Sequence, residues 1–378
     1  MLLENLPDQL EKMIRSLSHL TEQQLNRPVK ELSESEILDA FIPVIEQHNS
    51  WVTNGNLDQS LSTQMVVGPG DDCAVLEVPA CQLVLTTDTL TESFDFRRKW
   101  NSGDDTGGYD IGWKAATQNL ADVVSMRATP TTLLVSLSLP STVALQWVVD
   151  FAVGITASCK ANGASFCTIA GGDIGSSTEI SVTVTAIGQC LHKPLLRTGA
   201  KDGDVVAIAG ELGTAAAGLD VLETLAPNSV QGLSERPAEI NRMVRAQQRP
   251  QTPLTAALAA ASLAHSMMDI SDGLVKDAER MAKASGLSFH LESAKLAKDS
   301  SELESVARWL GFEKPQQIAL NWVLSGGENH GMLACFDSDQ QLPPGFRPIG
   351  VCRASTPGKV FVDGKAPEVS GWDHFIVS

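Results

Sequence analysis

The 378-residue chain contains no run of about 18 apolar residues, the length that a membrane-spanning helix needs. Its amino terminus also lacks the basic stretch and apolar core of a secretory signal. Only 28 lysines and arginines face 45 aspartates and glutamates, so the net charge is −17, and no basic stripe is available for nucleic acid or an anionic membrane. We therefore expect a cytoplasmic protein that binds neither nucleic acid nor membranes.

Familiar metal and nucleotide motifs are missing as well. The seven cysteines have no CxxC spacing, and the seven histidines form no pair three or four residues apart, which argues against a disulfide framework or a zinc site. No GxxxxGK[ST] loop occurs, because Gly171–Thr178 has glycines and hydroxyls but no lysine. Gly210-Glu-Leu-Gly213 is too short for a dinucleotide fingerprint, and neither a GxSxG elbow nor the protein-kinase signatures are found.

The chain is otherwise an ordinary globular sequence, with 43% hydrophobic and 19% charged residues. Periodicity predicts strands at 82–87, 131–139, 179–188, 205–209, 266–270, 287–291 and 332–336, and helices at 110–126, 144–162, 214–225, 252–264 and 272–285. Polar residues 299–304 are expected to form a surface loop. Because strands and helices mix in both halves, we expect two α+β or α/β domains at 31–192 and 193–378, after an extension at 1–30.

Six short acidic clusters stand where these elements are expected to end. They are Gly70-Asp71-Asp72, Thr86-Thr87-Asp88, Asn119-Leu120-Ala121-Asp122, Gly171-Gly172-Asp173, Asp269-Ile270-Ser271-Asp272-Gly273 and Gly326-Gly327-Glu328. Gathered carboxylates need a compensating cation, and hard oxygen ligands select Mg²⁺ or Ca²⁺. The glycines allow backbone to approach a ligand closely. The clusters therefore predict a multi-metal site for a polyphosphate.

Each cluster also has an ordinary structural interpretation. Asp122 could be a partnered carboxylate on an apolar helix face. Ser271 or Asp272 could simply cap the following helix, since both residue types are favoured N-caps. Gly171-Gly172-Asp173 could be no more than a glycine turn.

Taken in order, the motifs resemble those of the thiamine-monophosphate kinase family, within the aminoimidazole-ribonucleotide-synthetase-like superfamily. The matching stretches are Gly70–Leu76, Thr87–Leu90, Gly112–Ala115, Asn119–Asp122, Gly171–Asp173, Arg197–Ala200, Asp269–Gly273, Ser325–Glu328 and Trp372–Phe375. The resemblance implies an N-terminal α+β domain that forms a homodimer through its sheet, and a C-terminal α/β domain. It also implies transfer of the γ-phosphoryl group of ATP to thiamine monophosphate, with several Mg²⁺ ions, to give thiamine diphosphate.

The resemblance further assigns roles to individual residues. It implies metal contacts at Asp72, Thr86, Thr87, Asp88, Asp122, Asp173, Asp269 and Asp272. It implies ATP contacts at Gly172, Asp173, Arg197 and Ser271, and it places substrate contacts at Asp95, Glu328 and Trp372. Of these, Asp122, Arg197 and Asp272 are the expected catalytic residues. No general base is required, because the second pKa of a phosphate monoester is about 6 and the acceptor oxygen is already largely ionised.

Two segments depart from the family pattern. Asp95 stands where the family usually has a histidine, and Asn329-His330-Gly331-Met332 replaces the usual Asp-Tyr-Glu-Leu after Glu328. Two other functions therefore stay open. One is a sister synthetase that uses ATP on another acceptor, such as a selenophosphate synthetase or a hydrogenase-maturation dehydratase. The other is a degenerate nucleotide-binding regulatory protein.

Overall fold

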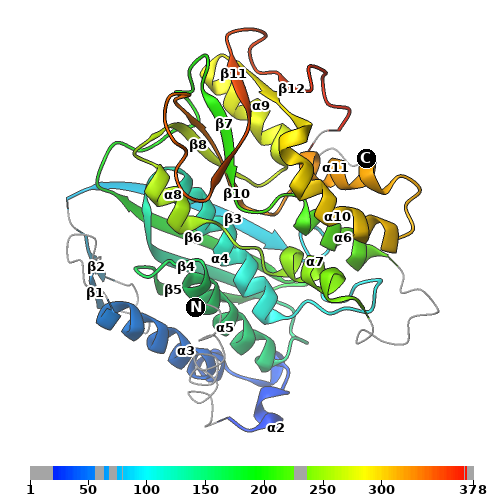
Figure 1. The fold of residues 1–378 in the computed structure, drawn as a ribbon. Coiled ribbons are helices and arrows are strands. Elements are labelled where there is room, and N and C mark those ends of the chain that lie inside the picture. Colours follow the sequence, from blue (N-terminus) through cyan, green and yellow to red (C-terminus); the bar gives the residue numbers. More distant parts are fainter. Residues whose placement is uncertain are drawn as a thin grey trace. The chain divides into compact units, whose positions relative to one another are not determined.

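The computed structural model describes residues 20–55, 64–67, 75–78, 80–224, 236–369 and 371–372 (Figure 1). These residues divide into two compact units. The first holds the described residues up to Lys99, together with Asp105–Val123 and Ala128–His192. The second holds Trp100–Asp104, Val124–Arg127 and the described residues from Lys193 onward. No helix among the described residues is both long and apolar enough to cross a membrane.

A four-stranded sheet forms the centre of the first unit. Its strands are β3 (Gln82–Thr91), β6 (Ser181–Cys190), β4 (Thr129–Leu139) and β5 (Thr168–Ser176), in that spatial order. Only the β4–β5 pair is parallel. A separate two-stranded antiparallel ribbon is made by β1 (Gln64–Val67) and β2 (Val75–Glu77). The strands predicted at 82–87, 131–139 and 179–188 are confirmed. The alternative interpretation of Gly171-Gly172-Asp173 as a glycine turn is wrong, because these residues lie inside β5.

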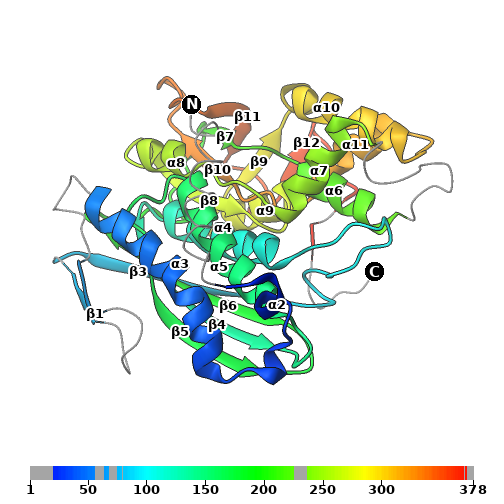
Figure 2. The ribbon, with the colours of Figure 1, turned by 90° about the horizontal axis from the view of Figure 1, so that it is seen from below.

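The helices α3 (Glu34–Gly55), α4 (Gly108–Ser125) and α5 (Leu145–Ala161) complete this unit. Helices α4 and α5 approach closely, because a Cβ at Gly112 would lie 2.2 Å from the carbonyl oxygen of Phe151. Helix α3 runs beside β5 (Figure 2), where Asn49 donates to the carbonyl of Ile169 and accepts from its N–H, both at 2.9 Å. Asn49 therefore occupies backbone groups that the edge strand would otherwise leave unpaired.

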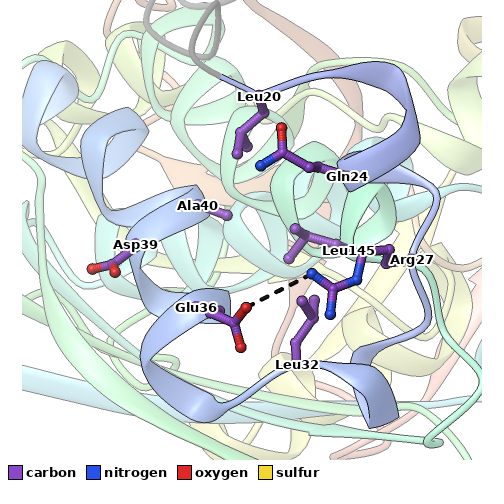
Figure 3. Close-up of a pocket in the computed structure, with 8 residues that line it drawn as sticks. All are labelled: Leu20, Gln24, Arg27, Leu32, Glu36, Asp39, Ala40 and Leu145. Atoms are coloured by element: carbon purple, nitrogen blue, oxygen red, sulfur yellow. Dashed lines mark ion pairs between the residues drawn. The ribbon is translucent and has the colours of Figure 1, made fainter.

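Residues 20–32 belong to the same unit. The short helix α2 (Glu22–Leu25) and the 3₁₀ turn η1 (Val29–Glu31) precede α3, and the N–H of Val29 donates to the carbonyl of Val143 at 2.8 Å. A small pocket lies between this segment and α3 and α5 (Figure 3), where Arg27 lies 3.7 Å from Glu36. None of the residues expected at the functional site lines this pocket.

The second unit is built on a six-stranded sheet. Its spatial order is β12 (Val360–Val362), β9 (Ser288–Leu291), β11 (Phe346–Arg353), β7 (Val205–Ala209), β10 (Gly331–Phe336) and β8 (Ala264–Ile270). Only β12 and β9 pair in parallel. The predicted strand at 205–209 matches β7, and those at 266–270, 287–291 and 332–336 correspond to β8, β9 and β10.

Helices share one apolar core with this sheet. They are α6 (Thr214–Glu223), α7 (Ala238–Gln248), α9 (Leu274–Ser285), α10 (Ala297–Trp309) and α11 (Pro315–Ser325), with the 3₁₀ turn η3 (Ser293–Leu296) before α10. The short helix α8 (Leu254–Ala260) belongs to the same unit. The expected loop at 299–304 is wrong, because these residues lie in α10. Its apolar stripe, Leu303, Val306 and Ala307, is fully buried, and burial of that stripe stabilises the helix despite its polar remainder.

Candidate active site

In the first unit, the structure joins two of the expected metal residues directly. The hydroxyl of Thr86, on β3, donates to Oδ2 of Asp122, on α4, at 2.6 Å. Both side chains are half-buried. A short O–H···O⁻ bond of this kind is stronger than a neutral one and fixes the direction of the carboxylate. Thr86 and Asp122 therefore form one preorganised oxygen pair.

The other expected residues on β3 divide between the two faces of the sheet. Asp88 follows Thr86 at a spacing of two and shares its face, whereas Thr87 points to the opposite face. That opposite face is exposed at Leu83 and Leu85. The Thr87 hydroxyl donates to the carbonyl of Val184 at 3.2 Å.

Asp173 also lies on the exposed face. Across the sheet, Asp173 on β5 pairs in register with Ser136 on β4. Ser136 pairs with Thr183 on β6, and Thr183 pairs with Thr89 on β3. With strands about 4.8 Å apart, Asp173 is roughly 14 Å from β3 across the sheet. Within one copy of the first unit, the structure therefore separates Asp173 from the Thr86–Asp122 pair.

Gly172 has a structural reason to be glycine. A Cβ at this position would lie 1.7 Å from the carbonyl oxygen of Val135, so any side chain would collide with β4. Gly171 has a φ of 148° and open space around it. The close β4–β5 approach accounts for Gly172, and the exposed Asp173 follows directly after it.

Asp95 is engaged within its own turn. Its Oδ2 accepts the N–H of Thr91 at 2.7 Å, and its own N–H donates to the carbonyl of Thr91 at 2.9 Å. Ser93 takes a φ of 76° in the same turn, and Phe94 beside it is 79% exposed. The carboxylate that replaces the family's usual histidine therefore closes the turn after β3.

Asn119 offers a further buried oxygen near Asp122 on the same helix. Its amide nitrogen donates to the carbonyl of Ala115 at 2.9 Å. Its Oδ1 is buried and has no hydrogen-bond partner among the described residues. A buried amide oxygen without a donor is costly, and a cation or a ligand donor would satisfy it.

In the second unit, the expected residues gather where β8 runs into α9. Asp269 is 3% exposed, and its Oδ2 lies 3.3 Å from Nδ1 of His330. Three residues on, Oδ2 of Asp272 pairs with the guanidinium of Arg280 at 2.5 Å and lies 3.7 Å from the Lys276 ammonium. Gly273 occupies the N-cap position of α9 without a side-chain bond, so the capping interpretation of Ser271 and Asp272 is wrong.

The residue that replaces a conventional cap is Asp277, which the sequence analysis missed. Its Oδ2 accepts the N–H of Asp272 at 2.9 Å, and its Oδ1 accepts from Arg280 at 2.6 Å. Burial, followed by the nearby negative charge of Asp269, raises the pKa of Asp277 to about 6. The sequence did contain a signal for this ion pair. Asp277 and Arg280 are three residues apart on a predicted helix, a spacing that brings their side chains together.

Glycines bring the Glu328 loop against this corner. The N–H of Glu328 donates to the carbonyl of Ser271 at 2.8 Å, and a Cβ at Gly327 would lie 2.5 Å from that same oxygen. Glu328 and His330 both have positive φ, 64° and 51°. The loop therefore places Glu328 beside Ser271, and Oε2 of Glu328 accepts from Gln247 at 3.2 Å.

Trp372 joins the same corner, whereas Arg197 is held elsewhere in the unit. The N–H of Trp372 donates to the carbonyl of Asp272 at 2.9 Å, and its side chain is 56% exposed. Arg197 is exposed, and its backbone carbonyl accepts from the hydroxyl of Ser285, the last residue of α9, at 3.1 Å.

The donor chemistry fits magnesium. The candidate ligands are carboxylate and hydroxyl oxygens, which Mg²⁺ prefers, and they include the Thr86–Asp122 pair and the buried Asp269. No three histidine, cysteine or acidic side chains converge into a finished metal site within the described ranges. Asp71 and Asp72 lie outside those ranges, as does Asp373-His374-Phe375.

Family models match both halves of the chain. Residues 70–190 match the N-terminal domain of AIR synthase related proteins, and residues 201–341 match the C-terminal domain. A thiamine-monophosphate kinase of Mycobacterium tuberculosis is 35% identical over 82% of this chain and 86% of its own length. A thiamine-monophosphate kinase of Aquifex aeolicus is 32% identical over 81% of this chain and 92% of its own length.

Solved structures agree with these matches. One described as AaThiL complexed with AMPPCP and TMP is 28% identical, covers 92% of this chain and 99% of its own, and superposes with a TM-score of 0.67. A thiamine-monophosphate kinase from Stenotrophomonas maltophilia is also 28% identical, with a TM-score of 0.70 over 86% of this chain and 96% of its own. A hydrogenase maturation protein HypE, at 15% identity and a TM-score of 0.61 over 90% and 95%, shares the fold alone. The chain therefore belongs to the thiamine-monophosphate kinase family of AIR synthase related proteins.

Proposed function

We propose that this chain is a thiamine-monophosphate kinase, which transfers the γ-phosphoryl group of ATP to thiamine monophosphate and releases thiamine diphosphate and ADP. The observation that carries the proposal is the 35% identity to a named thiamine-monophosphate kinase over 82% of the chain. The fold supports it, because a structure described as bound to AMPPCP and TMP superposes over 92% of the chain.

The site chemistry suits direct transfer between two phosphates. The acceptor oxygen has a pKa of about 6 and needs little help to lose its proton. The obstacle is repulsion between two anions, so the chain must position them and neutralise their charge. Side-chain oxygens of the Thr86–Asp122 pair and of Asp269 and Asp272 are held by hydrogen bonds and ion pairs that can supply such positioning.

We propose that Mg²⁺ is the cation, held by Asp72, Thr86, Thr87, Asp88, Asp122, Asp173, Asp269 and Asp272. When bound, it would supply positive charge that neutralises phosphate oxygens. Thr86, Asp88 and Asp122 would act as one group, since Thr86 and Asp88 share a face of β3 and Thr86 binds Asp122. Thr87 and Asp173, on the exposed face of the sheet, would serve a different ion.

ATP would contact Gly172, Asp173, Arg197 and Ser271, with Arg197 neutralising phosphate charge. Glu328 and Trp372 would meet the thiamine part of the substrate. Asp95 would act on the substrate side through the turn that it closes rather than through a free carboxylate. Asp122, Arg197 and Asp272 would be the residues on which turnover depends most.

We propose that the protein is a homodimer formed through the exposed face of the first unit's sheet. Leu83, Leu85 and Leu134 are 47%, 62% and 37% exposed and belong to strands β3 and β4. Apolar side chains gathered on one sheet face are typical of an interaction surface. The proposed domains are residues 31–192 and 193–378, after the extension at 1–30, and the proposed location is the cytoplasm.

One assay tests the kinase activity against its alternatives. The purified chain is incubated with Mg²⁺, γ-labelled ATP and thiamine monophosphate, and products are separated by chromatography. We expect label in thiamine diphosphate, and none when unphosphorylated thiamine replaces the monophosphate. ADP formed only with a different acceptor would identify a sister synthetase. Binding of ATP without any transfer would favour a regulatory protein.

A further inference from the structure

The backbone of Trp372 is fastened to the first turn of α9 at both of its polar atoms. Its N–H donates to the carbonyl of Asp272 at 2.9 Å, and its carbonyl accepts from the ammonium of Lys276. Gly371 presses on the same turn, because a Cβ there would lie 2.1 Å from the Asp272 carbonyl oxygen and 2.8 Å from Cβ of Lys276. The chain at 371–372 is therefore held against α9 by main-chain contacts and by one lysine.

The indole ring is left at the surface by this arrangement. Trp372 is 56% exposed, although a tryptophan side chain gains much free energy from burial. A ring whose backbone is already fixed loses little conformational entropy when a ligand stacks on it. Such a platform suits a planar cationic ring, since tryptophan is the best aromatic partner for a cation.

Lys276 also links this platform to the acidic corner. Its ammonium lies 3.7 Å from Oδ2 of Asp272, one turn earlier, and its side chain is 21% exposed. Asp272 is in turn held by Arg280. Lys276 therefore connects the carboxylate of Asp272, a proposed metal ligand, with the backbone carbonyl of Trp372, a proposed substrate contact.

We infer that Lys276 is a positioning residue, which holds Trp372 where its indole can stack on the cationic heteroaromatic ring of the substrate. The inference rests on the proposed function for the identity of that ring. Lys276 itself would not touch the substrate ring, because its ammonium already contacts the Trp372 carbonyl and the Asp272 carboxylate. Its effect would pass through Trp372.

Hydrogen exchange tests the fastening without any enzymatic assay. We compare the Trp372 amide in the unaltered protein, in Lys276→Met, in Lys276→Arg and in Lys298→Met. The last is a matched control, since Lys298 is an exposed lysine on α10. We expect exchange about tenfold faster in Lys276→Met, with Lys276→Arg and Lys298→Met near the unaltered rate. Equal rates in all four proteins would overturn the inference.

A double-mutant cycle tests the route of the effect. Lys276→Met should raise KM for thiamine monophosphate about five- to tenfold, with KM for ATP nearly unchanged. In a Trp372→Ala background, the same lysine change should add nothing further. Additive effects, an effect on KM for ATP alone, or a silent Trp372→Ala would each refute the inference. Failure of the unaltered protein to make thiamine diphosphate would instead refute the proposed function. The exchange experiment would still show whether Lys276 holds the Trp372 backbone against α9.

Discussion

His48 provides a quantitative test of the structure through pH. It is 1% exposed on α3, and its Nε2 lies 2.8 Å from the carbonyl oxygen of Cys167, so Nε2–H is the donor. Its Nδ1 is buried without a hydrogen-bond partner in the described part of the chain. Burial, reinforced by the charge of Lys160 and opposed by the bond to Cys167, lowers the pKa of His48 to about 4.

The sign follows from proton uptake. The unfolded chain binds a proton at His48 near its ordinary pKa of 6.5, whereas the folded chain does so only near 4. The stabilising contribution is therefore complete above pH 6.5 and is lost as the pH falls from 6.5 to 4. At about 1.4 kcal/mol per unit of pKa, the loss approaches roughly 3 kcal/mol below pH 4 and is about 2 kcal/mol at pH 5.

The perturbation is His48→Gln, whose amide can keep a donor to Cys167 but cannot titrate. Urea unfolding at pH 7.5 and pH 5 gives the free energy of unfolding for both proteins, followed by far-UV circular dichroism. Other groups titrate equally in both, so they cancel in the difference. We expect the unaltered protein to lose about 2 kcal/mol more than the variant between the two pH values. An equal pH dependence in the two proteins would refute the argument.

Three further changes test the site and the proposed assembly. Asp122→Asn should reduce kcat by at least about a hundredfold with an unchanged circular dichroism spectrum, and near-normal turnover would remove Asp122 from the catalytic set. Gly172→Ala should cost about 2–4 kcal/mol in urea unfolding, because its methyl group would meet the Val135 carbonyl at 1.7 Å; an unaffected midpoint would contradict the β4–β5 packing. Leu85→Glu should shift the protein from dimer to monomer in sedimentation velocity, and a dimer that persists would exclude this sheet face as the interface.

Much of the fold could be predicted where the spacing of apolar residues in the sequence matches the positions that are buried in the structure. Strand β7 is a short apolar run with four fully buried residues, and its predicted bounds match the structure. Strand β5 could not be predicted in the same way, because glycines at 171, 172 and 175 weaken a strand pattern. Only its pairing with β4 explains why Gly172 is tolerated there. Helix α10 was missed because its polar face dominates its composition.

The candidate site was predictable as a set of motifs but not as a set of contacts. Thr86 and Asp122 are 36 positions apart, and nothing in either motif shows that their side chains share a hydrogen bond. The fastening of Trp372 to Asp272 spans 100 positions and uses backbone atoms, which a side-chain pattern cannot reveal. Asp277 was overlooked because it follows the acidic cluster rather than belonging to it.

The charges at the β8–α9 corner bear on the proposed cation independently of family membership. Among the residues that the structure describes, the carboxylates of Asp269, Asp272 and Asp277 lie near two lasting positive charges, those of Arg280 and Lys276. His330 adds a bond to Asp269. Burial, followed by the nearby negative charge of Asp269, raises the pKa of Asp277. Carboxylates that are buried close together cost stability, so if Mg²⁺ binds at this corner as proposed, it should raise the urea midpoint of unfolding even without nucleotide. The acidic cluster does not have the geometry of a helix cap, so its carboxylates remain candidates for the proposed cation site.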